Sequence, residues 1–81
     1  MCSEWEGVKP DILAVGKALS GGMMPASAAF CNNDLMLTIK PGDHGSTFGG
    51  NPLAMCVARE AIKTIIEENM VENSLKMGEI F

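Results

Sequence analysis

The chain has 81 residues, enough for one small domain at most, and its 47% hydrophobic content is typical of a globular protein rather than a disordered one. Ten acidic against six basic side chains give a net charge of −4, and no Lys/Arg cluster occurs, so nucleic acid and anionic membranes are poor candidates as partners. No apolar run approaches the ~18 residues that a membrane-spanning helix needs.

Cysteine usage and the N-terminal residues indicate the compartment. Three widely spaced cysteines and a single histidine favour reduced thiols over a disulfide framework or a metal site. The first residues show no signal-peptide pattern, and Glu4 and Glu6 disfavour a transit peptide, which is poor in acidic residues. We therefore expect an intracellular, soluble protein whose targeting segment, where one exists, lies outside these residues.

The first strongly patterned segment follows an irregular lead-in of residues 1–10, in which Trp5 is expected to be a packing residue. The apolar run from Ile12 to Val15 has a breaker at each end and predicts a short buried parallel strand. Lys17 follows at its carboxyl end, where α/β sheets bind ligands. Partial burial there lowers the pKa of a lysine and makes its amine a nucleophile, although surface lysines at strand ends are common.

A second strand and a short helix are predicted next. The small-residue run of residues 26–31 is compatible with a second buried strand. Asn33 or Asp34 is a plausible N-cap for a short helix over residues 35–39.

Residues 41–50 form a glycine-rich loop long enough to suggest function, with a flexible surface connection as the alternative. Within it, Gly45, Ser46 and Thr47 offer backbone N–H groups and two hydroxyls, the components of an anion-binding nest. Between Ala18 and Asn51 the only cationic side chain is Lys40, so neutral donors fit phosphate binding here better than an ion-pair clamp does.

The last third of the chain has helical periodicity. Asn51 at the N-cap and a proline at the first helical position predict a helix start. Small and apolar residues at helical spacing then define one packing face, and Asn69 with Glu72 resembles a capping pair for a second helix. The residues of the packing face are Ala54, Ala58, Ala61, Ile62 and Ile65.

Three segments together resemble the class III pyridoxal-phosphate-dependent aminotransferases: residues 11–22, residues 25–28 and residues 39–53. The resemblance covers nearly the whole chain. It implies an α/β fold, with residues 1–81 forming part of the large domain of a fold-type-I transferase and containing no second domain. It also implies that Lys17 binds pyridoxal 5′-phosphate as a Schiff base. Thr47 is expected to contact the cofactor phosphate across a dimer interface, with Ser46 beside it.

Within that family the motifs are most similar to the branch that moves the δ-amino group of ornithine to 2-oxoglutarate, giving glutamate semialdehyde and glutamate. The resemblance implies a homodimer or higher homo-oligomer, amino-acid and 2-oxo-acid substrates, and a location in the mitochondrial matrix or the cytoplasm. Another ω-aminotransferase, such as one that uses acetylornithine, is the alternative. A different class remains open: a truncated, inactive product that only associates with full-length subunits. The family also needs an aspartate at the pyridine nitrogen, an aromatic ring over the cofactor and an arginine for the substrate carboxylate, and none can be assigned in this sequence.

Overall fold

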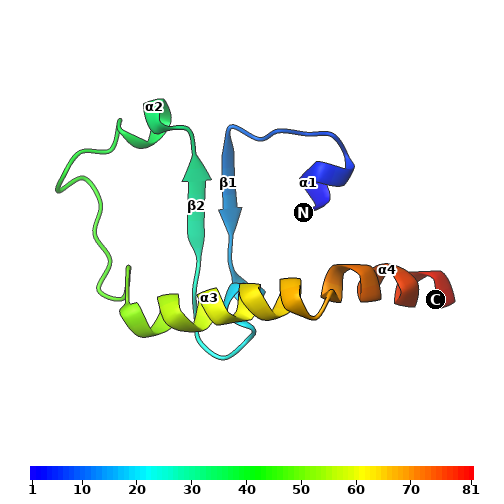
Figure 1. Ribbon diagram of the computed structural model, residues 1–81. Helices are drawn as coiled ribbons and strands as arrows, with labels where there is room; N and C mark the ends of the chain where they lie inside the picture. Colours follow the sequence, from blue (N-terminus) through cyan, green and yellow to red (C-terminus); the bar gives the residue numbers. More distant parts are fainter.

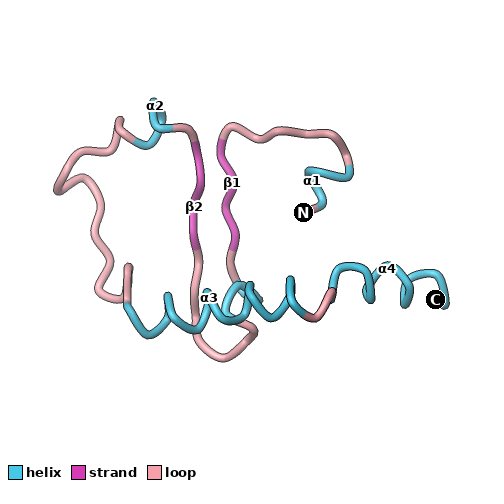
Figure 2. The backbone as a smooth tube through the Cα atoms, viewed as in Figure 1, coloured by secondary structure: helices cyan, strands magenta, loops and turns pink.

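The computed structural model describes all 81 residues as a two-stranded hairpin resting on a long helix (Figure 1). The strands β1 and β2 lie side by side, α3 passes across one end of the hairpin, and α4 continues beyond it. A long loop without regular structure connects α2 to α3 (Figure 2). The elements in chain order are α1 (Cys2–Trp5), β1 (Ile12–Val15), the 3-10 helix η1 (Lys17–Ser20), β2 (Ala28–Cys31), α2 (Asn33–Met36), α3 (Pro52–Glu67) and α4 (Met70–Ile80).

Both predicted strands form, but their pairing and burial differ from the prediction. They run antiparallel, with Ile12 opposite Cys31 and Val15 opposite Ala28. The expectation of a parallel strand is wrong, because a parallel pair needs a long crossover and only η1 and a turn lie between these strands. The expected burial is also absent: Ile12 is 64% exposed and Phe30 55% exposed, since no element of this chain covers the two faces of the hairpin.

The short elements also depart from the prediction in detail. Residues 2–5 of the expected irregular lead-in form the single turn α1, and Trp5 on it is 73% exposed instead of packed. The short helix α2 starts earlier than predicted, with Asn32 at its N-cap, and ends at Met36. At Asn69 the chain turns in the left-handed conformation (φ 51°), and α4 starts without the predicted side-chain cap.

Helix α3 begins where the sequence predicts. The Asn51 Oδ1 atom accepts hydrogen bonds from the backbone N–H groups of Leu53 (2.9 Å) and Ala54 (3.2 Å), and Pro52 occupies the first turn. This cap satisfies donors that the helix itself cannot pair. The prediction of the helix start is confirmed.

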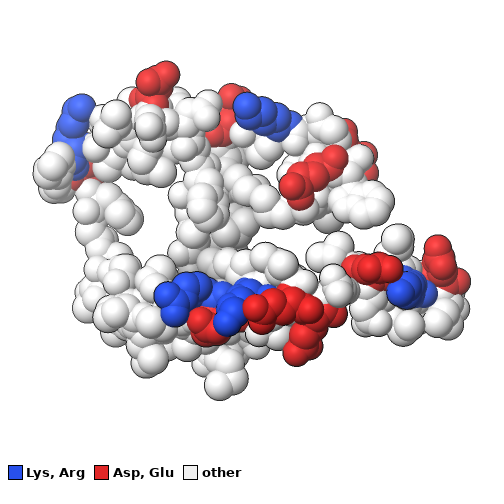
Figure 3. Space-filling view, in the orientation of Figure 1, with Lys and Arg blue, Asp and Glu red and all other residues white.

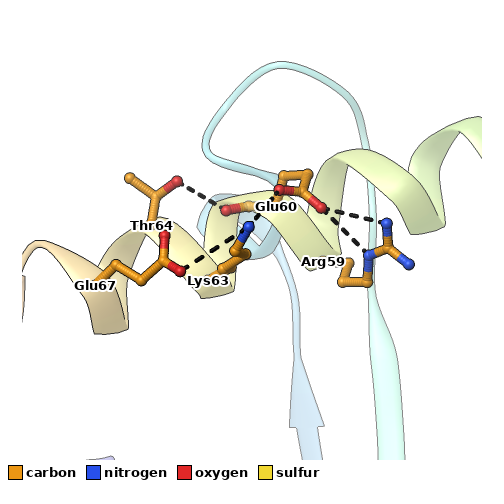
Figure 4. A network of polar contacts seen from close by, with 5 residues as sticks. All are labelled: Arg59, Glu60, Lys63, Thr64 and Glu67. Atoms are coloured by element: carbon orange, nitrogen blue, oxygen red, sulfur yellow. Dashed lines mark hydrogen bonds and ion pairs between the residues drawn. The ribbon is translucent and has the colours of Figure 1, made fainter.

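The outer face of α3 carries a chain of ion pairs (Figure 4). Glu60 contacts Arg59 at 3.3 Å and Lys63 at 3.8 Å, and Lys63 contacts Glu67 at 3.9 Å. The Thr64 hydroxyl donates a hydrogen bond to the Glu60 carbonyl at 2.8 Å. All these side chains are exposed, so each pair contributes little to stability.

Little of the chain is buried. Only three of its 81 residues are buried: Ser20, Ala54 and Ala58. The accessible surface is 7185 Å², whereas a compact folded chain of 8.6 kDa exposes about 4,700 Å². The radius of gyration is 15.5 Å against about 12 Å for a compact domain of this length. Figure 3 shows openings on both sides of the hairpin, and the only core lies where η1 meets α3.

No helix is long and apolar enough to span a bilayer.

Candidate functional site

Lys17 stands at the end of β1, as the sequence predicts, and its backbone is unusual. Val15 ends the strand, Gly16 is extended, and Lys17 then starts η1 with a φ of +52°. A left-handed backbone is uncommon for a residue other than glycine and is found preferentially at functional sites. The expected burial of Lys17 is not found, because its side chain is exposed within these 81 residues.

Gly16 brings the lysine turn close to the segment before β2. A Cβ atom at Gly16 would lie 3.5 Å from the Ser27 Cβ and 3.7 Å from the Ala26 carbonyl oxygen. The backbone beside Lys17 therefore packs directly against residues 26 and 27. This contact gives the lysine turn one wall of a pocket.

The glycine-rich loop is organised by short-range hydrogen bonds. The Ser46 Oγ atom accepts a hydrogen bond from the Gly49 N–H at 3.0 Å, and the Asn51 N–H donates to the Phe48 carbonyl at 3.3 Å. By contrast, the backbone N–H groups of residues 46, 47, 48 and 50 donate no hydrogen bond within the chain. Free backbone donors next to hydroxyls are the components that an anion-binding nest requires.

Lys40, at the start of this loop, is exposed and hydrogen-bonded locally. Its Nζ atom donates to the Leu37 carbonyl at 2.8 Å, and its backbone N–H donates to Asp43 Oδ2 at 2.8 Å. The Lys40 amine is thus engaged by the chain's own backbone, at the start of the loop. This agrees with the expectation that neutral donors, and not an ion-pair clamp, are available in residues 41–50.

The structure brings Lys17 and Ser46 to one pocket of about 350 Å³, a volume within the range of small-ligand sites. Lys17 is the only charged side chain that lines it. Thr47, the third predicted site residue, does not line this pocket and is exposed. The remaining lining residues are residues 25–27, residues 48–50 and, from the first turn of α3, Ala54 and Met55.

Sequence reasoning did not assign most of the lining of this pocket, and Ser27 and Phe48 are two such residues. Ser27 was expected only as part of a strand, and Phe48 only as part of the loop, yet both line the pocket beside Lys17. Phe48 is 81% exposed, an unusual setting for a large aromatic side chain. The available signal for Ser27 was its place in the segment of residues 25–28 that carries the family resemblance.

Other hollows of the molecule lack this chemistry. Three larger ones, of about 370, 610 and 760 Å³, are lined mainly by hydrophobic residues and contain neither Lys17 nor the loop. No group of three or more His, Cys, Asp or Glu side chains is placed to hold a metal ion. All three cysteines are free thiols.

An amine beside hydroxyls and unpaired backbone amides is the set of groups that suits a small ligand with an electrophilic carbon and an anionic group. The family model described as Aminotransferase class-III matches residues 1–81. The chain belongs to the class-III aminotransferase family.

Several similar curated relatives carry the name of one member of that family. The ornithine aminotransferase of Emericella nidulans is 54% identical over 81 residues, covering 100% of this chain and 18% of the relative. The mitochondrial ornithine aminotransferase of Drosophila melanogaster is 57% identical over 77 residues, covering 95% of this chain and 18% of the relative. The chain therefore spans about a fifth of the length of the curated relatives it matches.

Solved structures share the arrangement of these elements. The ornithine δ-aminotransferase of Plasmodium falciparum superposes with a TM-score of 0.92 at 53% identity, covering 98% of this chain and 21% of that one. An acetylornithine aminotransferase from Elizabethkingia anophelis superposes with a TM-score of 0.93 at 52% identity, covering 99% of this chain and 21% of that one. The antiparallel hairpin and its supporting helix are thus an arrangement found within larger aminotransferases.

Proposed function

We propose that these 81 residues are the lysine-bearing part of the large domain of a fold-type-I aminotransferase that acts on ornithine. The observation that carries the proposal is the shared pocket: the Lys17 amine and the Ser46 loop line the same cavity, within a chain that matches the class-III family along its whole length. The names of the curated relatives favour ornithine as the amino donor.

The residues of the pocket fit pyridoxal 5′-phosphate. The Lys17 Nζ atom would hold the aldehyde carbon through a covalent bond formed with loss of water, and the hydroxyl and free amides of the loop would face the phosphate. The first turn of α3 also lines the pocket, and the positive end of a 16-residue helix favours an anion there. When bound, the cofactor supplies an electron sink. The Lys17 amine, once released, holds and moves a proton at Nζ.

Thr47 is proposed to act in the site of a second subunit. Its side chain makes no hydrogen bond within the chain, it is exposed, and it lies next to Ser46 without lining the Lys17 pocket. An exposed loop residue that does not line the pocket of its own chain is available to a symmetric partner. This supports a homodimer in which each subunit gives the Lys17 of one site and the Thr47 of the other.

The proposed reaction moves the δ-amino group of ornithine to 2-oxoglutarate, giving glutamate semialdehyde and glutamate. The only arginine, Arg59, pairs with Glu60 on the outer face of α3 and does not line the pocket, so it is not the residue that would bind the substrate carboxylate there (Figure 4). Acetylornithine is the second candidate donor, since a solved acetylornithine aminotransferase is 52% identical. The mitochondrial names of several relatives favour the mitochondrial matrix over the cytoplasm.

The direct test uses the complete protein that carries this chain, with Lys17→Ala compared with Lys63→Ala. Lys63 is an exposed lysine on α3, remote from the pocket lining, and serves as the matched control. Lys17→Ala is expected to lose both borohydride-trappable cofactor and transamination of ornithine, whereas Lys63→Ala keeps both. Turnover that survives Lys17→Ala would rule out the assigned role. A wild-type protein that binds no cofactor would instead favour the inactive, truncated product.

Mixing subunits tests the role of Thr47 across the interface. Lys17→Ala and Thr47→Ala subunits are each expected to be inactive or nearly so alone, but a mixed dimer contains one site with both residues intact. Random mixing should restore about a quarter of wild-type activity, because half of the dimers are mixed and each has one complete site. No recovery on mixing would place Thr47 in the same site as its own Lys17, or in neither.

A further inference from the structure

Ser20 is the one fully buried side chain of the molecule, with an exposed fraction of 0%. Its hydroxyl donates a hydrogen bond to the Met24 carbonyl and accepts one from the Met24 N–H at 3.4 Å. The hydroxyl is therefore both donor and acceptor to the backbone of a single residue, Met24. Serine is mostly found on the surface, so complete burial in a chain with only three buried residues needs a specific explanation.

Ser20 and Lys17 belong to the same helical turn. They are the last and first residues of η1, and three further backbone hydrogen bonds close the turn around them: Leu19 to Gly16 (3.2 Å), Gly21 to Ala18 (2.9 Å) and Met23 to Ser20 (3.2 Å). Lys17 has a left-handed backbone, which is unfavourable for a residue with a Cβ atom. Such a conformation persists only where the surrounding structure holds it.

The turn rests on a stripe of alanines along α3. Ala54 and Ala58 are the other two buried residues, and a Cβ atom at Gly21 would lie 3.5 Å from the Ala61 Cβ. Small side chains on α3 let the backbone of η1 approach closely. The whole core of this chain is thus the contact that supports the lysine turn.

We propose that Ser20 is a positioning residue for Lys17: its hydroxyl closes the turn of residues 20–24 and so holds the left-handed backbone that presents the Lys17 amine to the pocket. This inference rests on the proposed function, because it concerns the amine that would bind the cofactor. Ser20 itself does not line the Lys17 pocket and touches no reacting atom.

The test compares Ser20→Ala with Thr38→Val in the complete protein. Thr38 also donates its hydroxyl to a backbone carbonyl, that of Leu35 at 2.7 Å, but it lies outside the pocket. The first measurement is amide hydrogen exchange at residues 19, 21 and 23, which needs no cofactor. Ser20→Ala removes both hydroxyl hydrogen bonds, but the accepted one is long at 3.4 Å. The loss therefore corresponds to about one full hydrogen bond, or about fivefold faster exchange, whereas Thr38→Val should not change it.

The second measurement is selectivity of labelling. Cofactor-free protein is treated with limiting pyridoxal 5′-phosphate, reduced with borohydride, and digested for mass spectrometry. Wild type should label Lys17 in preference to Lys63, an exposed lysine that serves as an internal standard. Ser20→Ala should lower this preference about fivefold, in step with exchange, and Ser20→Thr, which keeps the hydroxyl, should restore part of it.

The outcomes separate the two proposals. Faster exchange together with lost preference supports the positioning role. Faster exchange with unchanged preference makes the hydroxyl purely structural and overturns the inference, as does unchanged exchange. Global unfolding of Ser20→Ala would raise exchange throughout the chain and abolish the difference in labelling between Lys17 and Lys63. A melting temperature below the labelling temperature identifies this case. The test then rests on the labelling preference of the folded Ser20→Thr protein. A wild type without preference for Lys17 refutes the proposed function, and this inference falls with it.

Discussion

Gly49→Ala tests whether the short turn of the glycine-rich loop holds the pocket together. A Cβ atom at Gly49 would lie 2.9 Å from the Ser46 Cβ and 3.2 Å from the Ser46 Oγ. The Gly49 backbone is not left-handed, so the substitution introduces a steric conflict without a backbone penalty of its own. The new Cβ atom would clash with Ser46, whose Oγ atom accepts a hydrogen bond from the Gly49 N–H. The turn of residues 46–49 must open to relieve the clash.

The expected size follows from two contributions. Opening the turn loses one exposed hydrogen bond, which contributes about 1 kcal/mol. Relieving the close contact adds about 1 kcal/mol, at the low end of the penalty for overpacking because the loop is exposed and can shift. Together they predict about 2 kcal/mol, or roughly thirtyfold weaker retention of pyridoxal 5′-phosphate, in the complete protein.

The assay is dissociation of the cofactor, followed by its absorbance, in a double-mutant cycle with Ser46→Gly. Ser46→Gly alone should weaken retention about fivefold through loss of the hydroxyl. It also removes the atoms that conflict with a new Cβ, so Gly49→Ala should have little further effect in that background. Gly45→Ala is the control, because a Cβ there meets nothing within 4 Å. Additive effects of the two substitutions, or an equal effect of Gly45→Ala, would refute the reasoning.

Three further expectations concern stability. Asn51→Ala removes both cap hydrogen bonds of α3 and should cost about 1 kcal/mol in denaturant unfolding, with Asn51→Ser close to wild type; equal loss in both would mean that the cap is not the cause. Glu60→Ala breaks two exposed ion pairs and should change the unfolding free energy by less than about 0.5 kcal/mol, and a larger effect would show a buried role (Figure 4). The 81 residues expressed alone should bind a hydrophobic dye and exchange most amides rapidly, because they expose 7185 Å²; slow exchange in β1 would contradict this.

Local sequence signals predicted local structure well. Asn51 followed by proline fixed the start of α3, since a cap depends only on residues two or three positions away. The run from Ile12 to Val15 predicted the strand to the residue. Its pairing direction was not predictable from that run, because direction depends on the length of the connection to Ala28. Burial of the hairpin could not be predicted either, since an apolar run does not show which other segment packs against it.

The site was predicted in part. Lys17 and Ser46 were assigned through family motifs, and the structure brings both to one pocket although the sequence separates them widely. The position of Thr47 outside that pocket depends on the backbone path of the loop, which the residue types alone do not give. Ser20 lies within residues 11–22, which carry the family resemblance, but the sequence did not assign it a role of its own. A single serine followed by two glycines predicts a flexible turn, and only the burial and hydrogen bonding of Ser20 indicate a structural role.

Helix α3 supports both halves of the pocket. Its first turn, which includes Ala54, follows the loop that carries Ser46 and lines the pocket, and Ala58 and Ala61 lie further along the helix, where η1 packs. Ala54 and Ala58 are separated by about one helical turn, or 5.4 Å. A tilt of α3 as a rigid body would therefore move the Lys17 amine and the Ser46 loop together and leave the distance between them unchanged. A kink within that one turn would change the distance between the lysine turn and the loop. A straight α3 therefore keeps the length of the pocket, and so the length of the ligand that fits, constant.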